Sequence, residues 1–171
     1  RAGHARWRSL FEASPPTEAM NEALPEPIGV WHPLRRIGHG GMGTVYLVER
    51  NDAGFHQTGA LKLLRLGEES DAFLERFARE RQILASLSHP GIARLLDGGR
   101  DDAGRLWLAM ELVEGQRIDL HVIERNLGVA ARLKLFLQVI EAVEAAHARL
   151  LMHRDIKPNN VLVDADGRAK L

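Results

Sequence analysis

A glycine-rich turn between two strand-like segments is the feature that most constrains the fold of this chain. The turn runs from Gly38 to Gly43 and matches the pattern Gly-x-Gly-x-x-Gly. Taken alone, this pattern is a weak signal, because dinucleotide-binding folds and many ordinary turns share it. Here the glycines are followed by Thr-Val-Tyr-Leu (residues 44–47), whose β-branched and aromatic side chains favour a strand over the helix of the dinucleotide fold. The sequence therefore predicts a β-hairpin with glycines at its tip.

Further strand and helix patterns extend this hairpin into a domain. Apolar periodicity and turn residues predict strands at Leu34–Ile37, Val45–Val48, Gly59–Leu64, Ile92–Leu96, Leu106–Leu112 and Val161–Val163, and helices over about Asp71–Leu87 and Val129–Leu150. The apolar face of the second helix is predicted to carry Leu133, Phe136, Ile140, Val143 and His147. We therefore expect antiparallel strands with one helix, followed by a mainly helical region.

A lysine and a glutamate on these elements are predicted to form an ion pair. Lys62 shares one face of its strand with Ala60 and Leu64, because side chains alternate along a strand. Glu80 lies on the apolar stripe of the following helix, where an unpaired carboxylate would cost about 3–5 kcal/mol. For an isolated pair, exposure of both groups to water would be the more common arrangement. Their order after a glycine-rich hairpin favours the ion pair.

The stretch His153-Arg154-Asp155-Ile156-Lys157-Pro158-Asn159-Asn160 carries acidic, basic and amide groups close together. Asp, Asn and Pro often gather in ordinary surface turns, and that alternative is the usual one for a random cluster. Eight residues in this order are harder to explain as a turn, and they resemble the catalytic loop of protein kinases.

The ordered motifs together resemble a protein kinase over about Leu34 to Leu171, and residues 40–46 are similar to bacterial members of the eukaryotic-type (Hanks-type) serine/threonine kinases. The resemblance implies an α+β, bilobal fold, with a complete five-stranded antiparallel small lobe carrying one helix and a partial helical large lobe. The expected divisions are residues 1–29 as leader and linker, 30–113 as small lobe and hinge, and 114–171 as partial large lobe.

This resemblance implies transfer of the γ-phosphoryl group of ATP to Ser or Thr hydroxyls of protein substrates. Asp155 would accept or orient the proton of the hydroxyl, Lys157 would neutralise charge on the transferred group, and Asn160 would bind Mg²⁺. A Lys followed by Pro158 is more similar to the serine/threonine class than to the tyrosine class.

The resemblance also implies an ATP site. The glycines would cover the phosphates, Lys62 would hold the α and β phosphates, and Glu80 would hold Lys62. Met110 would gate the pocket behind adenine, and the backbone of Glu111 and Val113 would bond the base edge. The implied ATP-binding residues are Ile37, Gly38, Gly40, Gly43, Val45, Ala60, Lys62, Glu80, Met110, Glu111, Val113 and Leu162.

The chain departs from the family pattern in two places. It stops at Leu171, before the Asp-Phe-Gly motif that supplies the principal magnesium ligand. We therefore expect it to be part of a longer protein, with the apolar stripe of the second helix left partly exposed. Expressed as written, the chain is expected to be inactive and prone to aggregate. Leu150 stands at a turn where relatives often have Gly, so a local difference in the backbone is expected.

The composition limits which partners and which cellular location we expect. The 23 basic and 23 acidic side chains cancel, so the net charge gives no argument for nucleic acid or an anionic membrane. Without Cys there is no disulfide scaffold and no thiolate metal site, which suits the cytosol. No apolar run is long enough to cross a bilayer. We expect a cytoplasmic location and protein partners, with neither nucleic acid nor a membrane segment in this portion.

Two alternatives remain open at this point. One is a pseudokinase-like module that binds nucleotide or a partner protein without catalysis, against which Lys62, Asp155 and Asn160 argue. The other is a kinase of the same fold that acts on a small molecule such as an aminoglycoside or choline. Lys157, Pro158 and the glycine-rich turn favour the protein kinase.

Overall fold

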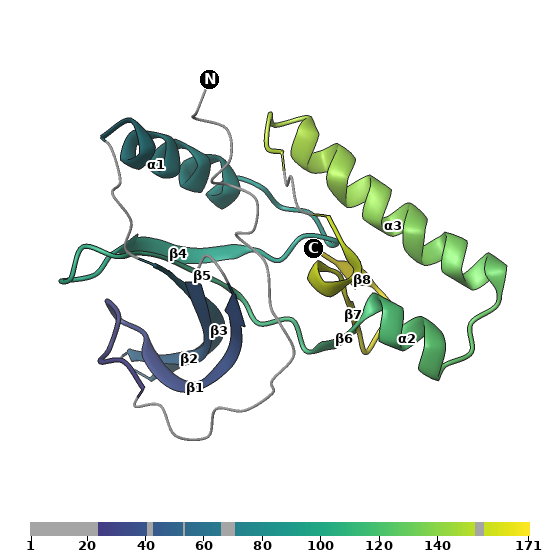
Figure 1. Ribbon diagram of the computed structural model, residues 1–171, viewed down its shortest axis with the longest axis horizontal. Coiled ribbons are helices and arrows are strands. Elements are labelled where there is room, and N and C mark those ends of the chain that lie inside the picture. The colour runs from purple at the N-terminus through teal and green to yellow at the C-terminus, as the bar shows by residue number, and fades with distance from the viewer. Residues whose placement is uncertain (1–23, 41–42, 53, 66–70, 153–155) are drawn as a thin grey trace. The chain divides into compact units, whose positions relative to one another are not determined.

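The computed structural model describes residues 24–171, with the exception of 41–42, 53, 66–70 and 153–155. The described residues divide into two compact units (Figure 1). The first, called the sheet unit below, contains residues 24–85 and 95–112. The second, called the helical unit, contains residues 86–94 and 113–171.

An antiparallel sheet of five strands, in the order β1-β2-β3-β5-β4, forms the sheet unit (Figure 1). This finding confirms the α+β class and the predicted small lobe. Helix α1 packs against β4. The elements are β1 (His32–Gly40), β2 (Gly43–Asp52), β3 (Phe55–Leu64), α1 (Asp71–Ala85), β4 (Leu95–Arg100) and β5 (Leu106–Glu111).

The position of β4 differs from the predicted strand at Ile92–Leu96. The strand starts at Leu95 and includes Gly98 and Gly99, which lie beyond the end of the predicted strand. A Cβ at Gly99 would lie 3.2 Å from the ring of Trp107 on the neighbouring strand, and one at Gly98 would lie 2.9 Å from the Leu108 side chain. These glycines make room for large side chains within the sheet, so their turn-forming tendency does not apply here.

One hydrophobic core cluster of the sheet unit lies on one side of the sheet. It consists of Ile28, Trp31, Val48, Leu61, Leu63, Trp107 and Ala109. Trp31 is fully buried, its indole N–H donates to Asp97 Oδ2 at 3.3 Å, and the Arg50 guanidinium lies 5.2 Å from its ring centre. Ile28 and Trp31 exchange two backbone hydrogen bonds. The core therefore includes residues that precede β1.

The helical unit combines two helices with a small sheet of three strands. Its elements are β6 (Gly115–Arg117), α2 (Ile118–Glu124), α3 (Val129–His147), the 3₁₀ turn η1 (Pro158–Asn160), β7 (Leu162–Asp164) and β8 (Ala169–Lys170). The Gln138 side chain on α3 accepts a hydrogen bond from the Ala169 N–H at 2.7 Å, which ties the helix to the edge of this sheet. Within the described part of the chain, no helix has both the length and the hydropathy needed to cross a membrane.

The buried face of α3 is not the one predicted from periodicity. Leu135, Val139 and Ala142 are buried, whereas Leu133 and Phe136 are 55% and 59% exposed. Ile140 and His147 are also exposed, and Val143 packs against the core, which confirms the expectation that this apolar stripe stays partly exposed. The helix carries apolar residues around most of its circumference, so periodicity alone could not select the buried side.

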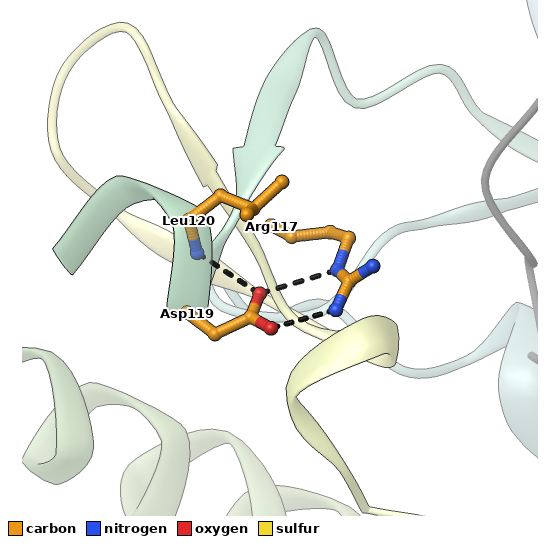
Figure 2. Close-up of polar contacts among 3 residues, drawn as sticks. All are labelled: Arg117, Asp119 and Leu120. Atoms are coloured by element: carbon orange, nitrogen blue, oxygen red, sulfur yellow. Dashed lines mark hydrogen bonds and ion pairs between the residues drawn. The ribbon is translucent and has the colours of Figure 1, made fainter. Parts of the chain in front are cut away.

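An ion pair joins the end of β6 to the first turn of α2. Figure 2 shows the Asp119 carboxylate bound by Arg117 Nη2 at 2.6 Å and Nε at 3.2 Å, and by the Leu120 N–H at 3.0 Å. The guanidinium hydrogen bond is the main reason why the pKa of Asp119 lies below its usual 3.8. The pair fixes the turn from strand to helix.

Leu150, just after α3, has a left-handed backbone with φ of 61°. Such a conformation crowds the Cβ of any residue other than glycine. The Leu150 side chain is 91% exposed, so its burial offers no compensation. The backbone thus keeps a glycine-like conformation although the residue is Leu.

We predict that Asp119→Asn weakens folding at neutral pH by about 0.2–1 kcal/mol, because the Arg117 pair is partly exposed to water. A carboxyl group with a lowered folded-state pKa stabilises the fold above its unfolded pKa and loses this effect as the pH falls through the folded value. The difference between wild type and variant should therefore shrink below pH 3.8. Urea unfolding of wild type and variant, at neutral pH and again below pH 3.8, measures this difference in stability. Asp52→Asn, at an exposed position, is the control. A stability difference that does not change with pH would contradict the prediction.

We predict that Leu150→Gly raises the free energy of unfolding by about 0.5–1 kcal/mol. Relief of the left-handed strain, about 1–2 kcal/mol, exceeds the extra chain entropy that glycine gives the unfolded state. Thermal unfolding of the two proteins checks this. The matched control is Leu150→Ala, which removes the same exposed side chain but keeps the strain; equal gains from Ala and Gly would show that the backbone is not strained.

Candidate active site

The glycine-rich turn lies at the end of the β1–β2 hairpin. Gly38 is opposite Val45 and Gly40 is opposite Gly43 in the strand register. Gly43 is also opposite Leu64 on β3, and a Cβ on it would lie 2.1 Å from the Leu63 carbonyl oxygen. Only glycine fits at this position. The close approach holds the hairpin against β3.

Four of the predicted ATP-binding residues come together on one face of the sheet. Val45 on β2 is opposite Lys62 on β3, and Ala60 is opposite Met110 on β5. Residues opposite each other in a sheet direct their side chains to the same face, and Ala60 and Lys62 are separated by one strand period. Ile37 is half-buried on β1 next to Gly38. The sheet therefore presents an apolar surface with one ammonium group.

Lys62 is buried, with 7% of its surface exposed, and its neighbours Leu61 and Leu63 are buried too. An ammonium group in such surroundings needs negative charge nearby. Glu80 is half-buried on α1 of the same unit. Its ion pair with Lys62 stays a prediction.

The remaining predicted ATP-binding residues are not part of this sheet face. Glu111 ends β5, and Val113 begins the second segment of the helical unit. Leu162 begins β7, opposite Arg117 and Lys170. The backbone contacts of Glu111 and Val113 with a base stay predictions.

The predicted catalytic loop is described only in part. Asp155 lies outside the described residues, together with His153 and Arg154. Asn160 ends η1, is 8% exposed, and donates its backbone N–H to the Lys157 carbonyl at 2.9 Å. Pro158 opens this turn, where its missing N–H has no cost. The turn thus fixes the spacing of Lys157 and Asn160.

The chemistry of Asn160 suits a magnesium ligand, because Mg²⁺ prefers oxygen donors such as the carboxamide oxygen. One such donor is not a complete site. No cluster of His, Cys, Asp or Glu that could hold a metal ion alone is found among the residues that the structure describes. Asn160 therefore fits magnesium as one member of a larger ligand set.

Sequence analysis missed three polar contacts, two made by His39 and one made by Arg117. His39, between the glycines, contacts Thr44 and Arg65 through its two ring nitrogens. Arg117 and Asp119 form the ion pair described above. The sequence offered a signal in both cases, since His39 interrupts the glycines and Arg117 precedes Asp119 by two positions. The strand register and side-chain conformations that make the contacts could not be read from it.

Comparison with known proteins identifies the family of this chain. The family model described as "Protein kinase domain" matches residues 31–171. The serine/threonine-protein kinase PrkC of Bacillus subtilis is 37% identical over 84% of this chain, and PknH of Mycobacterium tuberculosis is 35% identical over 91%. These alignments span 22% and 25% of the two relatives, so the chain corresponds to about a quarter of their length.

A solved structure shares the fold as well. A crystal structure of the Mycobacterium tuberculosis PknI kinase domain has a TM-score of 0.72 and 36% identity, and the alignment covers 87% of this chain and 62% of that chain. The glycine hairpin, Lys62 and the turn at Asn160 all lie within residues 31–171, which the family model matches. This chain belongs to the protein kinase domain family.

Proposed function

We propose that this chain forms the first part of the catalytic domain of a serine/threonine protein kinase, which phosphorylates Ser or Thr residues of proteins with ATP and Mg²⁺ in the cytoplasm. One observation carries the proposal: the buried ammonium of Lys62 shares a sheet face with Val45, beside the glycine hairpin. Bacterial relatives that are named serine/threonine-protein kinases support it. Residues 30–113 would serve as small lobe and hinge, 114–171 as the start of the large lobe, and 1–29 as a leader.

In this proposal the sheet unit binds ATP. Backbone N–H groups of the glycine hairpin donate to the phosphates, which are anionic and balance the buried charge of Lys62. Glu80 orients the lysine. The small side chain of Ala60 and the branched side chain of Val45 leave a flat apolar surface for adenine, and Met110 limits its depth. These residues bind and orient the nucleotide without taking part in bond making.

The helical unit supplies the groups for transfer. The substrate hydroxyl oxygen attacks the γ-phosphorus as the bond to the β–γ bridging oxygen breaks, and ADP leaves. Asp155 orients the hydroxyl and accepts its proton, and Lys157 neutralises charge on the transferred group. The carboxamide of Asn160 would hold magnesium, which when bound neutralises phosphate charge.

Phosphotransfer from γ-labelled ATP in the complete protein tests this function. We expect labelling of Ser and Thr in casein-like substrates, and a loss of about 10²–10⁴-fold in kcat for Asp155→Asn because the hydroxyl is no longer oriented or deprotonated. Labelling of small alcohols without proteins would indicate a small-molecule kinase. ATP binding without any transfer would indicate a binding module, and either result refutes the proposal.

The proposed pairing of Lys62 with Glu80 is tested by Glu80→Gln, which keeps the shape of the side chain and removes its charge. We expect kcat/KM for ATP to fall by about 10–100-fold, because the buried ammonium loses its counter-charge. Steady-state kinetics measure the effect. Glu75→Gln on the exposed side of α1 is the matched control and should change kcat/KM by less than about twofold, as surface substitutions usually do. Equal behaviour of the two variants would rule out the pairing.

A further inference from the structure

Three polar side chains meet at the glycine end of the sheet, and each comes from a different strand or its end. His39 Nδ1 lies 3.1 Å from Thr44 Oγ1, and His39 Nε2 lies 2.8 Å from Arg65 Nη2. His39 is opposite Thr44 in the β1–β2 register, and Arg65 directly follows β3. We call His39, Thr44 and Arg65 the hairpin brace. It connects three consecutive strands of the sheet.

The chemistry of these groups assigns one tautomer to His39. A guanidinium group can only donate hydrogen bonds, so Nε2 of His39 must accept from Arg65. In the neutral ring the proton then lies on Nδ1, which donates to the Thr44 hydroxyl. With this tautomer each of the two contacts has one donor and one acceptor. Both contacts of His39 can therefore be hydrogen bonds, including the one with the basic side chain of Arg65.

The brace lies on the side of the sheet away from the proposed phosphate site. Thr44 is opposite Leu63, whose side chain is in the hydrophobic core, while the adjacent Val45 is opposite Lys62. Successive side chains of a strand point to opposite faces. The brace therefore acts on a nucleotide only through the hairpin backbone.

We propose that His39, Thr44 and Arg65 are positioning residues that hold the glycine hairpin in its nucleotide-binding position before ATP arrives. The inference rests on the proposed ATP-dependent function. Glycines at the tip give the backbone great freedom, and ordering it upon binding weakens affinity. The His39–Thr44 pair is the last pair with side chains before Gly40 and Gly43. The contact of His39 with Arg65 adds a side-chain link to the end of β3, beside the backbone approach of Gly43 to the same strand.

Substitutions that remove both contacts of His39, or only one of them, test the brace in the complete protein. His39→Ala removes both contacts and should raise KM for ATP by about three- to tenfold, the effect of a lost hydrogen bond, with kcat changed by less than about twofold. His39→Gln keeps an acceptor near the Nε2 position and should restore part of the affinity, but only while Arg65 is present. Arg65→Ala as a single variant should also raise KM for ATP. Combined with His39→Ala, it should have no further effect on KM.

A second readout does not depend on turnover. Amide hydrogen exchange in residues 38–45 of the nucleotide-free protein should be faster in His39→Ala, and also in Thr44→Val, which keeps the side-chain shape. His32→Ala, an exposed histidine at the other end of β1, is the matched control and should alter neither exchange nor KM.

The outcomes separate the two proposals. A wild-type protein that neither binds ATP nor transfers phosphate would refute the proposed function and, with it, the role of the brace. Normal ATP binding by the wild type, together with unchanged KM and unchanged exchange in His39→Ala, would refute the brace alone. A parallel loss of kcat and melting temperature in His39→Ala would also refute it, because it would show a general structural role.

Discussion

Burial of the Lys62 ammonium within an apolar strand is the constraint on which the sheet unit depends. Leu61 and Leu63 direct their side chains into the core on one face, and Lys62 lies between them on the other. A buried ammonium costs several kcal/mol unless negative charge faces it. The core contacts of Leu61 and Leu63 stabilise the same strand, so β3 combines apolar packing on one face with a buried cation on the other.

The strands and long helices could be predicted because their patterns are local. Alternation and β-branched residues mark β2 and β3, and helical periodicity marks α1 and α3. Prediction failed where distant packing decides. Gly98 and Gly99 lie within β4 because Trp107 and Leu108 need the space, and the buried side of α3 depends on which of its apolar stripes meets Val161 and Val163. The short β6 and α2 carry too few residues for a periodic signal.

The candidate site shows the same division between local and distant information. The faces of Lys62 and Val45 follow from strand alternation once the hairpin is recognised. Asp155 lies outside the described residues, so its assignment still rests on the motif alone. The contact of His39 with Arg65 requires the register of three strands, which no short pattern contains. The sequence therefore predicts which residues bind the nucleotide, while the contacts of His39 with Thr44 and Arg65 are found only in the structure.

The residues that precede β1 determine where a shortened form of the sheet unit can begin. The family match begins at residue 31, yet Ile28 is 1% exposed and the Gly29 backbone lies against the Trp107 ring. A shortened protein cut at the family boundary would delete an interior side chain and open one side of an indole to water. The domain boundary given by the family match therefore differs from the boundary given by burial. A shortened protein should begin before Ile28.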